Sequence, residues 1–417
     1  MREADIAWMM IATALVLLMT PALGFFYGGM VRAKNALNTV MMSVVALGVS
    51  GMSWCVLGYS LAFSGDGPLL GGLGLALLRG VDLAPRATVP HVLFFAYQAS
   101  FAIITGALVS GAIVERMRFR PYVAFLALFT AVVYAPVAHW VWSGGWLQRL
   151  GALDYAGGTV VHIDAAAAAL VAAVVLGPRR DYARQAMLPH NVPFTLLGAG
   201  LLWFGWFGFN AGGAMGASTN AALAFVNTLL APIATLCVWL ALDLRRTGHV
   251  TAIGAATAIV VGLVAITPAA GYVSPRAALA IGAIAAGPSY LALLYRARTR
   301  LDDSLDVVAA HGLGGATGAL LTGVFAQRAY GAAAGGVLDG NPHQLLVQAL
   351  GVVAAAAYSG GATFVILKLI GLASPLRAAE RDERLGLDIT QHGEEAYTRG
   401  DGALLLLRPT VGDKEAA

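Results

Sequence analysis

The sequence is poor in charged residues and in cysteine. Only 12% of its 417 residues are charged, against about 25% in a typical soluble domain, so a water-soluble fold of this size would lack polar surface. The two cysteines, Cys55 and Cys237, lie inside apolar runs, which indicates packed thiols and not a disulfide or a metal-binding pair. Without an HExxH motif or a Cys/His cluster, the sequence predicts no metal centre and no cofactor.

Basic clusters with interleaved aromatic residues are also missing, although the formal net charge is +4. Such clusters mark nucleic-acid-binding surfaces, so this class is excluded. What the chain has in abundance is apolar sequence: 59% of its residues are hydrophobic and the mean hydropathy is +0.74. These values indicate an all-α polytopic membrane protein, in which the 51 glycines allow helices to approach closely in the lipid bilayer.

Eleven apolar runs are long enough to cross a bilayer as helices. Because this number is odd, the two ends of the helical region lie on opposite sides of the membrane. With the N-terminus outside, the inner loops hold thirteen Lys and Arg residues and the outer segments hold six, so the positive-inside rule predicts an N-out, C-in orientation. The runs are 6–31, 39–63, 89–114, 122–142, 159–177, 194–214, 220–242, 250–268, 275–295, 305–326 and 344–371.

The composition changes near the end of the chain. The segment from Arg377 to Ala417 is charged and too polar to span a membrane. We therefore expect residues 1–372 to form a transmembrane domain and residues 373–417 to form a cytoplasmic tail. The predicted localisation is the inner (plasma) membrane of the cell, with multiple passes.

Helices 1–5 and 6–10 show signs of an internal repeat. Asp154 stands eight residues before His162, and Asp303 stands eight residues before His311, at matching places in the two halves. Since five helices per half is an odd number, the second half must be inverted relative to the first, and the eleventh helix is left at the periphery. In many transporters with inverted repeats, the binding site lies at the interface of the two halves.

His162 and His311 are the histidines that lie well inside the apolar runs. An ionisable side chain at membrane depth is costly and usually functional. For a single histidine, a hydrogen bond to a neighbouring helix is an equally good explanation, but a matched pair favours function. Because each imidazole can both donate and accept a hydrogen bond, the pair suits a proton relay.

Aromatic residues are expected near the two histidines. Phe101, Trp142, Trp206 and Phe209 lie in runs of the predicted helical region. Ordinary packing and the aromatic belts at the membrane interfaces account for most tryptophans in such a protein. The functional interpretation is a cation–π cup for a small cation at the outer mouth.

Several long motifs follow one another from about residue 7 to residue 397. In order, they are GFFYGGMVRAKNAL, YQASFAIITGALVSGAIVERMRF, GALDYAGGTVVHIDAA, GWFGFNAGG, AALAFVNT, TPAAGYV, the HG of the tenth helix and GLDITQHGEEAY. Together they resemble the ammonium transporter family (Amt/Mep/Rh), in particular its bacterial Amt type. The resemblance implies a transporter of ammonium and its analogue methylammonium, not an enzyme, that assembles as a homotrimer with one pore per subunit. It also implies that a PII-type regulator docks at the tail.

The resemblance further implies a role for individual residues along the transport path. They fall into substrate-binding residues, a gate of stacked rings and a proton relay in the pore. These are Trp142, Phe101, Asp154 and Trp206 for substrate; Phe101 and Phe209 for the gate; and His162 and His311 for the relay. Trp206 is the member of the first set that lines the pore, and Asp154 is a buried acid beneath the outer site.

Two positions depart from the family pattern. Gly213 stands where the family often has a serine whose hydroxyl joins the outer site, so one hydrogen-bonding group is missing there. Asp164 stands where the family often has an uncharged polar residue. Two residues along a helix correspond to about 200°, so Asp164 is expected to face a neighbouring helix and not the pore, in a protonated or hydrogen-bonded form.

The sequence favours a transporter that recruits ammonium at the outer site, removes its proton and passes ammonia through an apolar pore. The proton is expected to be relayed separately by the twin histidines. An electroneutral, Rh-like channel for ammonia gas is the alternative within the family. An ammonium sensor that signals through its tail is a second alternative. An intramembrane hydrolase is disfavoured because no activated serine or metal cluster accompanies the histidines and acids.

Overall fold

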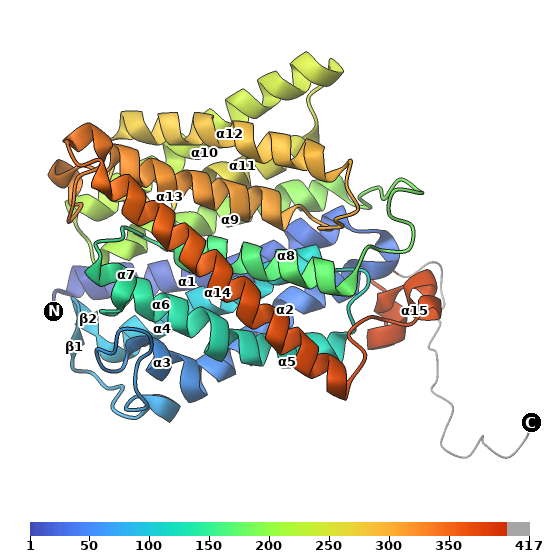
Figure 1. The fold of residues 1–417 in the computed structure, drawn as a ribbon, viewed down its shortest axis with the longest axis horizontal. Coiled ribbons are helices and arrows are strands. Elements are labelled where there is room, and N and C mark those ends of the chain that lie inside the picture. The colour runs from blue at the N-terminus through green and yellow to red at the C-terminus, as the bar shows by residue number, and fades with distance from the viewer. Residues whose placement is uncertain (398–417) are drawn as a thin grey trace, which may run out of the picture.

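The computed structural model describes residues 1–397 and is almost entirely helical. Most helices run along a common direction and form one bundle (Figure 1). Within the described residues, the β structure is a hairpin of two short strands, β1 (Pro85–Arg86) and β2 (Val89–Pro90), ahead of α4. Residues 398–417, which belong to the predicted tail, lie outside the described part of the chain.

The α-helices of the first predicted half are α1 (Glu3–Met30), α2 (Ala36–Ser53), α3 (Tyr59–Phe63), α4 (His91–Val109), α5 (Phe119–Phe129), α6 (Ala135–Trp142), α7 (Trp146–Arg149) and α8 (Asp164–Leu176). Those that follow are α9 (Val192–Ala211), α10 (Thr219–Thr247), α11 (Ala252–Ile266), α12 (Pro275–Arg296), α13 (Gly314–Phe325), α14 (His343–Ala373) and α15 (Glu380–Leu385). Five π-helical turns adjoin them: η2 (Trp54–Gly58), η5 (Thr130–Tyr134), η6 (Gly158–Ile163), η8 (Val308–Leu313) and η11 (Asp388–His392). Short 3₁₀ turns complete the chain: η1 (Ala33–Asn35), η3 (Ala76–Leu78), η4 (Ser110–Ala112), η7 (Gly212–Ala214), η9 (Arg328–Tyr330) and η10 (Val337–Asp339).

The helices are long and apolar enough for a membrane protein. Ten helical segments of the described residues reach spanning length, and α11 is a further apolar helix of 10–17 residues within the predicted run 250–268. A helix of about 20 residues spans the hydrocarbon core, and shorter ones are accommodated in a bundle. The prediction of an all-α, multi-pass membrane protein is therefore confirmed. The count of eleven spans and the N-out orientation remain predictions.

The first helices of the two predicted halves lie against each other at the centre of the bundle. α1 packs along α9, so the two halves share a long interface. α14, the helix expected at the periphery, crosses diagonally over α8 on one face of the molecule (Figure 1). The N-terminus and α15 lie at opposite ends of the bundle (Figure 1).

Buried ion pairs hold together the loops at the end of the bundle that the predicted orientation places inside. Glu115 accepts hydrogen bonds from Arg32 at 2.9 Å and from Arg179 at 2.6 Å. Arg179 also binds Asp302 through Nε and Nη2, both at 2.8 Å. Burial alone would raise the pKa of Glu115, but Arg179 and Arg32 lower it to about 2. Such fork-shaped, fully paired contacts join the segments after α1, α4, α8 and α12.

The first part of the predicted tail folds back onto the start of α2. The Asp388 carboxylate accepts the backbone N–H groups of Leu37 at 3.0 Å and Asn38 at 2.7 Å. The Asn35 side chain accepts the Leu387 N–H at 2.8 Å. The tail through residue 397 is therefore attached to the helical region, while the division into domains at residue 372 remains a prediction.

Candidate functional site

An aromatic cavity of about 260 Å³ opens at the predicted outer end of the bundle. Rings supply most of its wall, and a few polar groups converge on it, as in many small-ligand sites. The cavity contains three of the predicted substrate-binding residues, Phe101, Trp142 and Asp154. The other lining residues are Phe63, Phe94, Tyr97, Gln98, Tyr155, Ala156, Gly213, Met215 and Tyr272.

Trp142 is held in place by the chain segment that carries Asp154. Its indole N–H donates to the backbone carbonyl of Asp154 at 2.9 Å, and its ring meets Phe101 edge-on, with 6.0 Å between centroids. The two ring planes stand at 87° to one another. This arrangement presents π-faces and ring edges to the cavity, which suits a small cation.

The Asp154 carboxylate is a cap for η6. Its two oxygens accept four backbone N–H groups, those of residues 157 and 158 at 2.8 and 2.7 Å and those of residues 159 and 160 at 2.8 and 3.1 Å. Gly157 makes this possible because its φ of 114° lies in the left-handed region, which favours glycine. At Gly158 a Cβ would meet the Pro268 ring at 2.5 Å. Both Asp154 oxygens are therefore engaged with the backbone, and the residue fixes the turn that begins η6.

Two stacked phenylalanines close the floor of the outer cavity. The Phe101 and Phe209 rings are 4.2 Å apart and inclined by 28°, and both side chains are buried. Tyr97, one turn before Phe101, fixes the facing helix by donating to the backbone carbonyl of Phe209 at 2.8 Å. The predicted gate residues thus meet although they come from α4 and α9.

The predicted relay histidines lie directly below the stacked rings. The His162 ring is inclined by 19° to Phe209 at 6.0 Å, and its Nδ1 lies 3.2 Å from Nδ1 of His311. Trp206 stacks on His162 at 5.4 Å, so it lines the predicted pore below the predicted gate and not the outer cavity. Both histidines lie in π-helical turns, η6 and η8. Such turns are rare and frequently occur at functional sites.

The contact between the two Nδ1 atoms determines what the pair offers to the pore. One Nδ1 must donate and the other must accept, so in the neutral pair one Nε2 is an acceptor and the other carries a proton. The Nε2 of His162 is buried and has no hydrogen-bond partner. The pair therefore presents one proton donor and one proton acceptor to a molecule in the pore.

The pore beside the histidines is narrow and apolar. Its cavity has a volume of about 10 Å³, close to the roughly 10–15 Å³ that one water molecule needs. Apart from the histidines and the Trp206 indole, the walls are hydrocarbon and aromatic rings. The remaining lining residues are Met19, Leu23, Phe26, Ile104, Leu108, Val161, Leu202, Phe209 and Val260.

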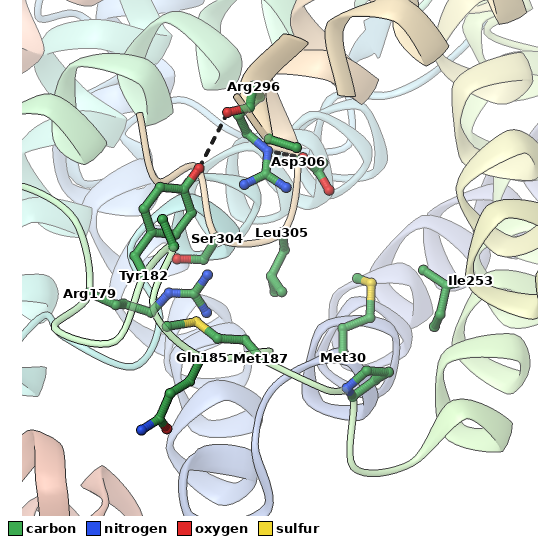
Figure 2. Close-up of a pocket in the computed structure, with 13 residues that line it drawn as sticks. Met30, Arg179, Tyr182, Gln185, Met187, Ile253, Arg296, Ser304, Leu305 and Asp306 are labelled. Carbon is green, nitrogen blue, oxygen red and sulfur yellow. Dashed lines mark hydrogen bonds and ion pairs between the residues drawn. The ribbon is translucent and has the colours of Figure 1, made fainter. Parts of the chain in front are cut away.

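A second large cavity, of about 350 Å³, lies at the predicted inner end and is shown in Figure 2. Its wall includes Met30 at the end of α1 and Asp306 just before η8. The Arg296 guanidinium pairs with Asp306 at 2.5 Å, and Tyr182 donates to the Arg296 carbonyl at 3.3 Å (Figure 2).

Gly213 and Asp164, the two positions that depart from the family pattern, have different surroundings in the structure. At Gly213, a Cβ would lie 3.0 Å from the Tyr155 ring, so the tyrosine fills the wall that a serine would otherwise share. Asp164 does not line the pore. It lies beside Ser359 of α14 and is fully buried.

Sequence reasoning missed Gln98 as a residue of the outer cavity. Its side chain is buried, and its Oε1 has no hydrogen-bond partner. Gln98 lies three residues before Phe101, so both occupy the same face of α4. This spacing within the YQASF motif was the available signal.

In the described residues, no three His, Cys, Asp or Glu side chains converge as a metal site would need.

Comparisons with known proteins show which family this chain matches. A family model described as "Ammonium Transporter Family" matches residues 7–397. An "Ammonium transporter" from Bacillus subtilis (strain 168) is 44% identical over 402 residues, which cover 95% of this chain and 99% of the relative. The "Ammonium transporter Amt1" of Archaeoglobus fulgidus is 42% identical over 95% of this chain and 100% of its own length.

Solved structures share the fold over most of the chain. A "Sensor Amt Protein" superposes with a TM-score of 0.87 at 32% identity, covering 93% of this chain and 98% of that chain. The crystal structure of Candida albicans Mep2 also gives a TM-score of 0.87, at 35% identity, over 91% of this chain and 87% of that chain.

Proposed function

Because this chain belongs to the ammonium transporter family, we propose that it recruits ammonium in the outer cavity and releases its proton there. Neutral ammonia then passes the stacked phenylalanines and the twin histidines. The proton follows separately along the histidine pair. The observation that carries this proposal is the hydrogen-bonded pair of His162 and His311, placed in an apolar pore with room for about one small molecule.

The cost of desolvation explains why deprotonation comes first. Moving a small cation from water into a low-dielectric pore costs on the order of 20 kcal/mol by the idealised Born estimate, and several kcal/mol effectively. The walls beside the histidines are apolar and cannot compensate for that loss. Ammonium can leave a proton behind and cross as a neutral molecule, whereas potassium cannot. The pore thereby selects between two cations of similar size.

Each group of residues has a defined part in the proposal. Trp142 and Phe101 hold the cation through their π-systems, and the capped Asp154 carboxylate adds negative charge beneath them. Phe101 and Phe209 exclude water from the pore. His162 and His311 supply a hydrogen-bond donor and an acceptor. These replace the hydrogen bonds to water that ammonia loses when it enters the pore.

The assembly and partners are also part of the proposal. The protein forms a homotrimer in the plasma membrane, each subunit with its own pore. A PII-type regulator docks at the predicted inner face, where the tail through residue 397 folds against α2. The transmembrane domain comprises residues 1–372 and the tail residues 373–417.

Transport current tests the function and separates the alternatives. On a solid-supported membrane, proteoliposomes with the purified protein are expected to give a current after a jump in ammonium concentration and none after an equal jump in potassium. Uptake of ¹⁵N-ammonium into the same vesicles measures flux. Uptake without current would identify an electroneutral gas channel. Tight ammonium binding with neither uptake nor current would instead support a sensor. One solved structure of the same fold is described as a sensor protein.

Trp142→Leu is expected to weaken selection at low substrate concentration. Leucine is also apolar but removes the π-face, the contact with Phe101 and the hydrogen bond to the Asp154 carbonyl. A cation–π contact is worth about 0.5–2 kcal/mol, so the concentration giving half-maximal current should rise by roughly 2- to 30-fold. Trp203→Leu, outside the outer cavity, serves as the control. An unchanged concentration dependence in Trp142→Leu would remove this residue from the cation site.

A further inference from the structure

The outer cavity is much larger than the ammonium ion that the proposed function places in it. Its volume is about 260 Å³, whereas a cavity needs roughly 10–15 Å³ to hold one water molecule, and ammonium is close to water in size. The pore beside the histidines has a volume of only about 10 Å³. The outer cavity therefore has room for cations that are too large for the pore.

Aromatic rings form most of the wall of the outer cavity. Cages of aromatic rings bind quaternary ammonium groups, because the positive charge of such a cation is spread over methyl groups that pack against the π-faces. A quaternary ammonium donates no N–H hydrogen bond, so it needs no acceptor in the wall. The aromatic lining residues are Phe63, Phe94, Tyr97, Phe101, Trp142, Tyr155 and Tyr272.

Three of these rings already use their polar atoms within the protein. The Tyr97 hydroxyl donates to the Phe209 carbonyl at 2.8 Å, and the Tyr155 hydroxyl donates to Oδ1 of Asn220 at 2.7 Å. The Trp142 indole N–H donates to a backbone carbonyl at 2.9 Å. These rings therefore offer the cavity their carbon surfaces, which suit an apolar cation better than a strongly hydrated one.

Two glycines fix the Tyr155 ring in this wall. A Cβ at Gly213 would lie 3.0 Å from Cε1 of the ring, and a Cβ at Gly271 would overlap Cε2 and Cζ. Tyr272 meets the same ring edge-on, with 5.1 Å between centroids. The ring is held closely by these neighbours, so this part of the wall is preorganised, and a ligand that binds it loses little affinity to ordering of the site.

A cation of the chain itself already stacks on two rings of the wall. The Arg86 guanidinium lies 5.1 Å from the Phe94 ring centroid and 5.6 Å from that of Phe63. Both distances are within the roughly 6 Å of a cation–π contact. Since like charges repel, a second cation that enters the cavity is expected to bind at the other rings, Trp142 and Tyr155 among them.

We propose that the outer cavity also binds quaternary ammonium cations, such as tetramethylammonium, and that these cations inhibit ammonium transport because they bind but do not cross. A quaternary ammonium has no N–H proton to release, so it cannot become neutral. It stays charged in front of the stacked Phe101 and Phe209 rings, and the pore beyond them holds about one water-sized molecule. Binding depends on the cavity alone, whereas inhibition rests on the proposed function.

Ammonium transport by proteoliposomes in the presence of tetramethylammonium tests the inhibition. With tetramethylammonium chloride on both sides of the vesicle membrane, the ammonium concentration giving half-maximal transport should rise while the maximal rate stays the same. Sodium chloride at equal concentration controls for ionic strength, and tert-butanol, a neutral molecule of similar size and shape, controls for charge. ¹⁴C-labelled tetramethylammonium should not enter the vesicles. Equal effects of tetramethylammonium and tert-butanol, or uptake of the label, would overturn the proposal.

Saturation-transfer difference NMR with tetramethylammonium measures binding without transport, so it distinguishes the failure of this proposal from that of the proposed function. A binding signal in a protein that does not transport ammonium would support the cavity site and contradict the proposed function. Normal ammonium transport with neither a binding signal nor inhibition would contradict the cavity site alone.

Variants of the wall locate the bound cation. Trp142→Leu and Tyr155→Leu should each weaken tetramethylammonium binding by roughly 2- to 30-fold, as expected for one lost cation–π contact. Tyr155→Phe keeps the ring and should bind like the wild type, as should Trp203→Leu, which lies outside the cavity. Equal binding by Tyr155→Leu and Tyr155→Phe, or equal losses in Trp142→Leu and Trp203→Leu, would contradict the site. Should Tyr155→Leu fail to fold, the comparison of the two tryptophan variants still decides.

Discussion

Replacing either His162 or His311 with alanine is expected to lower ammonium uptake by at least about tenfold while the protein still folds. The two rings share one hydrogen bond at 3.2 Å, and removing either ring leaves the other as a lone polar group in an apolar pore. In the proposed mechanism, ammonia then loses a partner that replaced its hydration, and the proton loses its relay. A loss of about 1.4 kcal/mol in transition-state stabilisation already gives a tenfold change in rate.

The measurement is ¹⁵N-ammonium uptake and current in the same proteoliposomes, with size-exclusion chromatography to check assembly. His249→Ala is the control because this histidine is exposed in the loop before α11. It should transport like the wild type. Wild-type flux in both pore variants would exclude the relay, and current that persists without uptake would assign the histidines to ammonia passage alone.

Replacing Asp154 with alanine is expected to have the largest effect on stability and to abolish transport. The carboxylate accepts four backbone N–H groups at the start of η6. Each buried donor left without a partner costs about 1–3 kcal/mol, so the loss over this turn is several kcal/mol, a large fraction of the stability of an ordinary protein. The turn also positions the Trp142 indole and carries His162, so the outer site and the pore lose their geometry together.

Thermal unfolding in detergent and the yield of folded protein measure this effect. Asp303→Ala provides an internal comparison, since Asp303 occupies the matching place in the second half but accepts a single N–H, that of Val308 at 2.7 Å. Its unfolding temperature should fall less. Asp66→Ala, at an exposed loop position, should leave stability unchanged. Equal losses in Asp154→Ala and Asp303→Ala would show that the four-bond cap is not the source of stability.

The fold class could be predicted from the sequence because hydropathy in a membrane protein is a strong local signal. Runs of about twenty apolar residues can satisfy their backbone only as helices in lipid, and each predicted run contains a helix in the structure. That His162 and His311 lie inside apolar helical segments was equally plain, since this follows from their place in the run. The functions assigned to these residues remain predictions.

Other features were not readable from local sequence. The π-helical turns η6 and η8 form hydrogen bonds between residues five apart, and no residue preference predicts this pattern. The eight-residue spacing between Asp154 and His162 suggested an acid near the site, but not that all four backbone N–H groups would turn toward it. Gln98 was overlooked because its spacing from Phe101 is a weak signal by itself, and only the structure shows that its buried side-chain oxygen has no partner.

The sequence by itself determined that this chain is a bundle of membrane helices with two matched histidines, because length and hydropathy act within each segment. Only the tertiary structure decided which segments meet. Nδ1 of His162 faces Nδ1 of His311 across 149 residues of chain, and Phe101 stacks on Phe209 from another helix. Asp164 lies beside Ser359 for the same reason: contacts between helices depend on how whole surfaces pack, and side-chain packing is a property of the assembled bundle and not of any one segment.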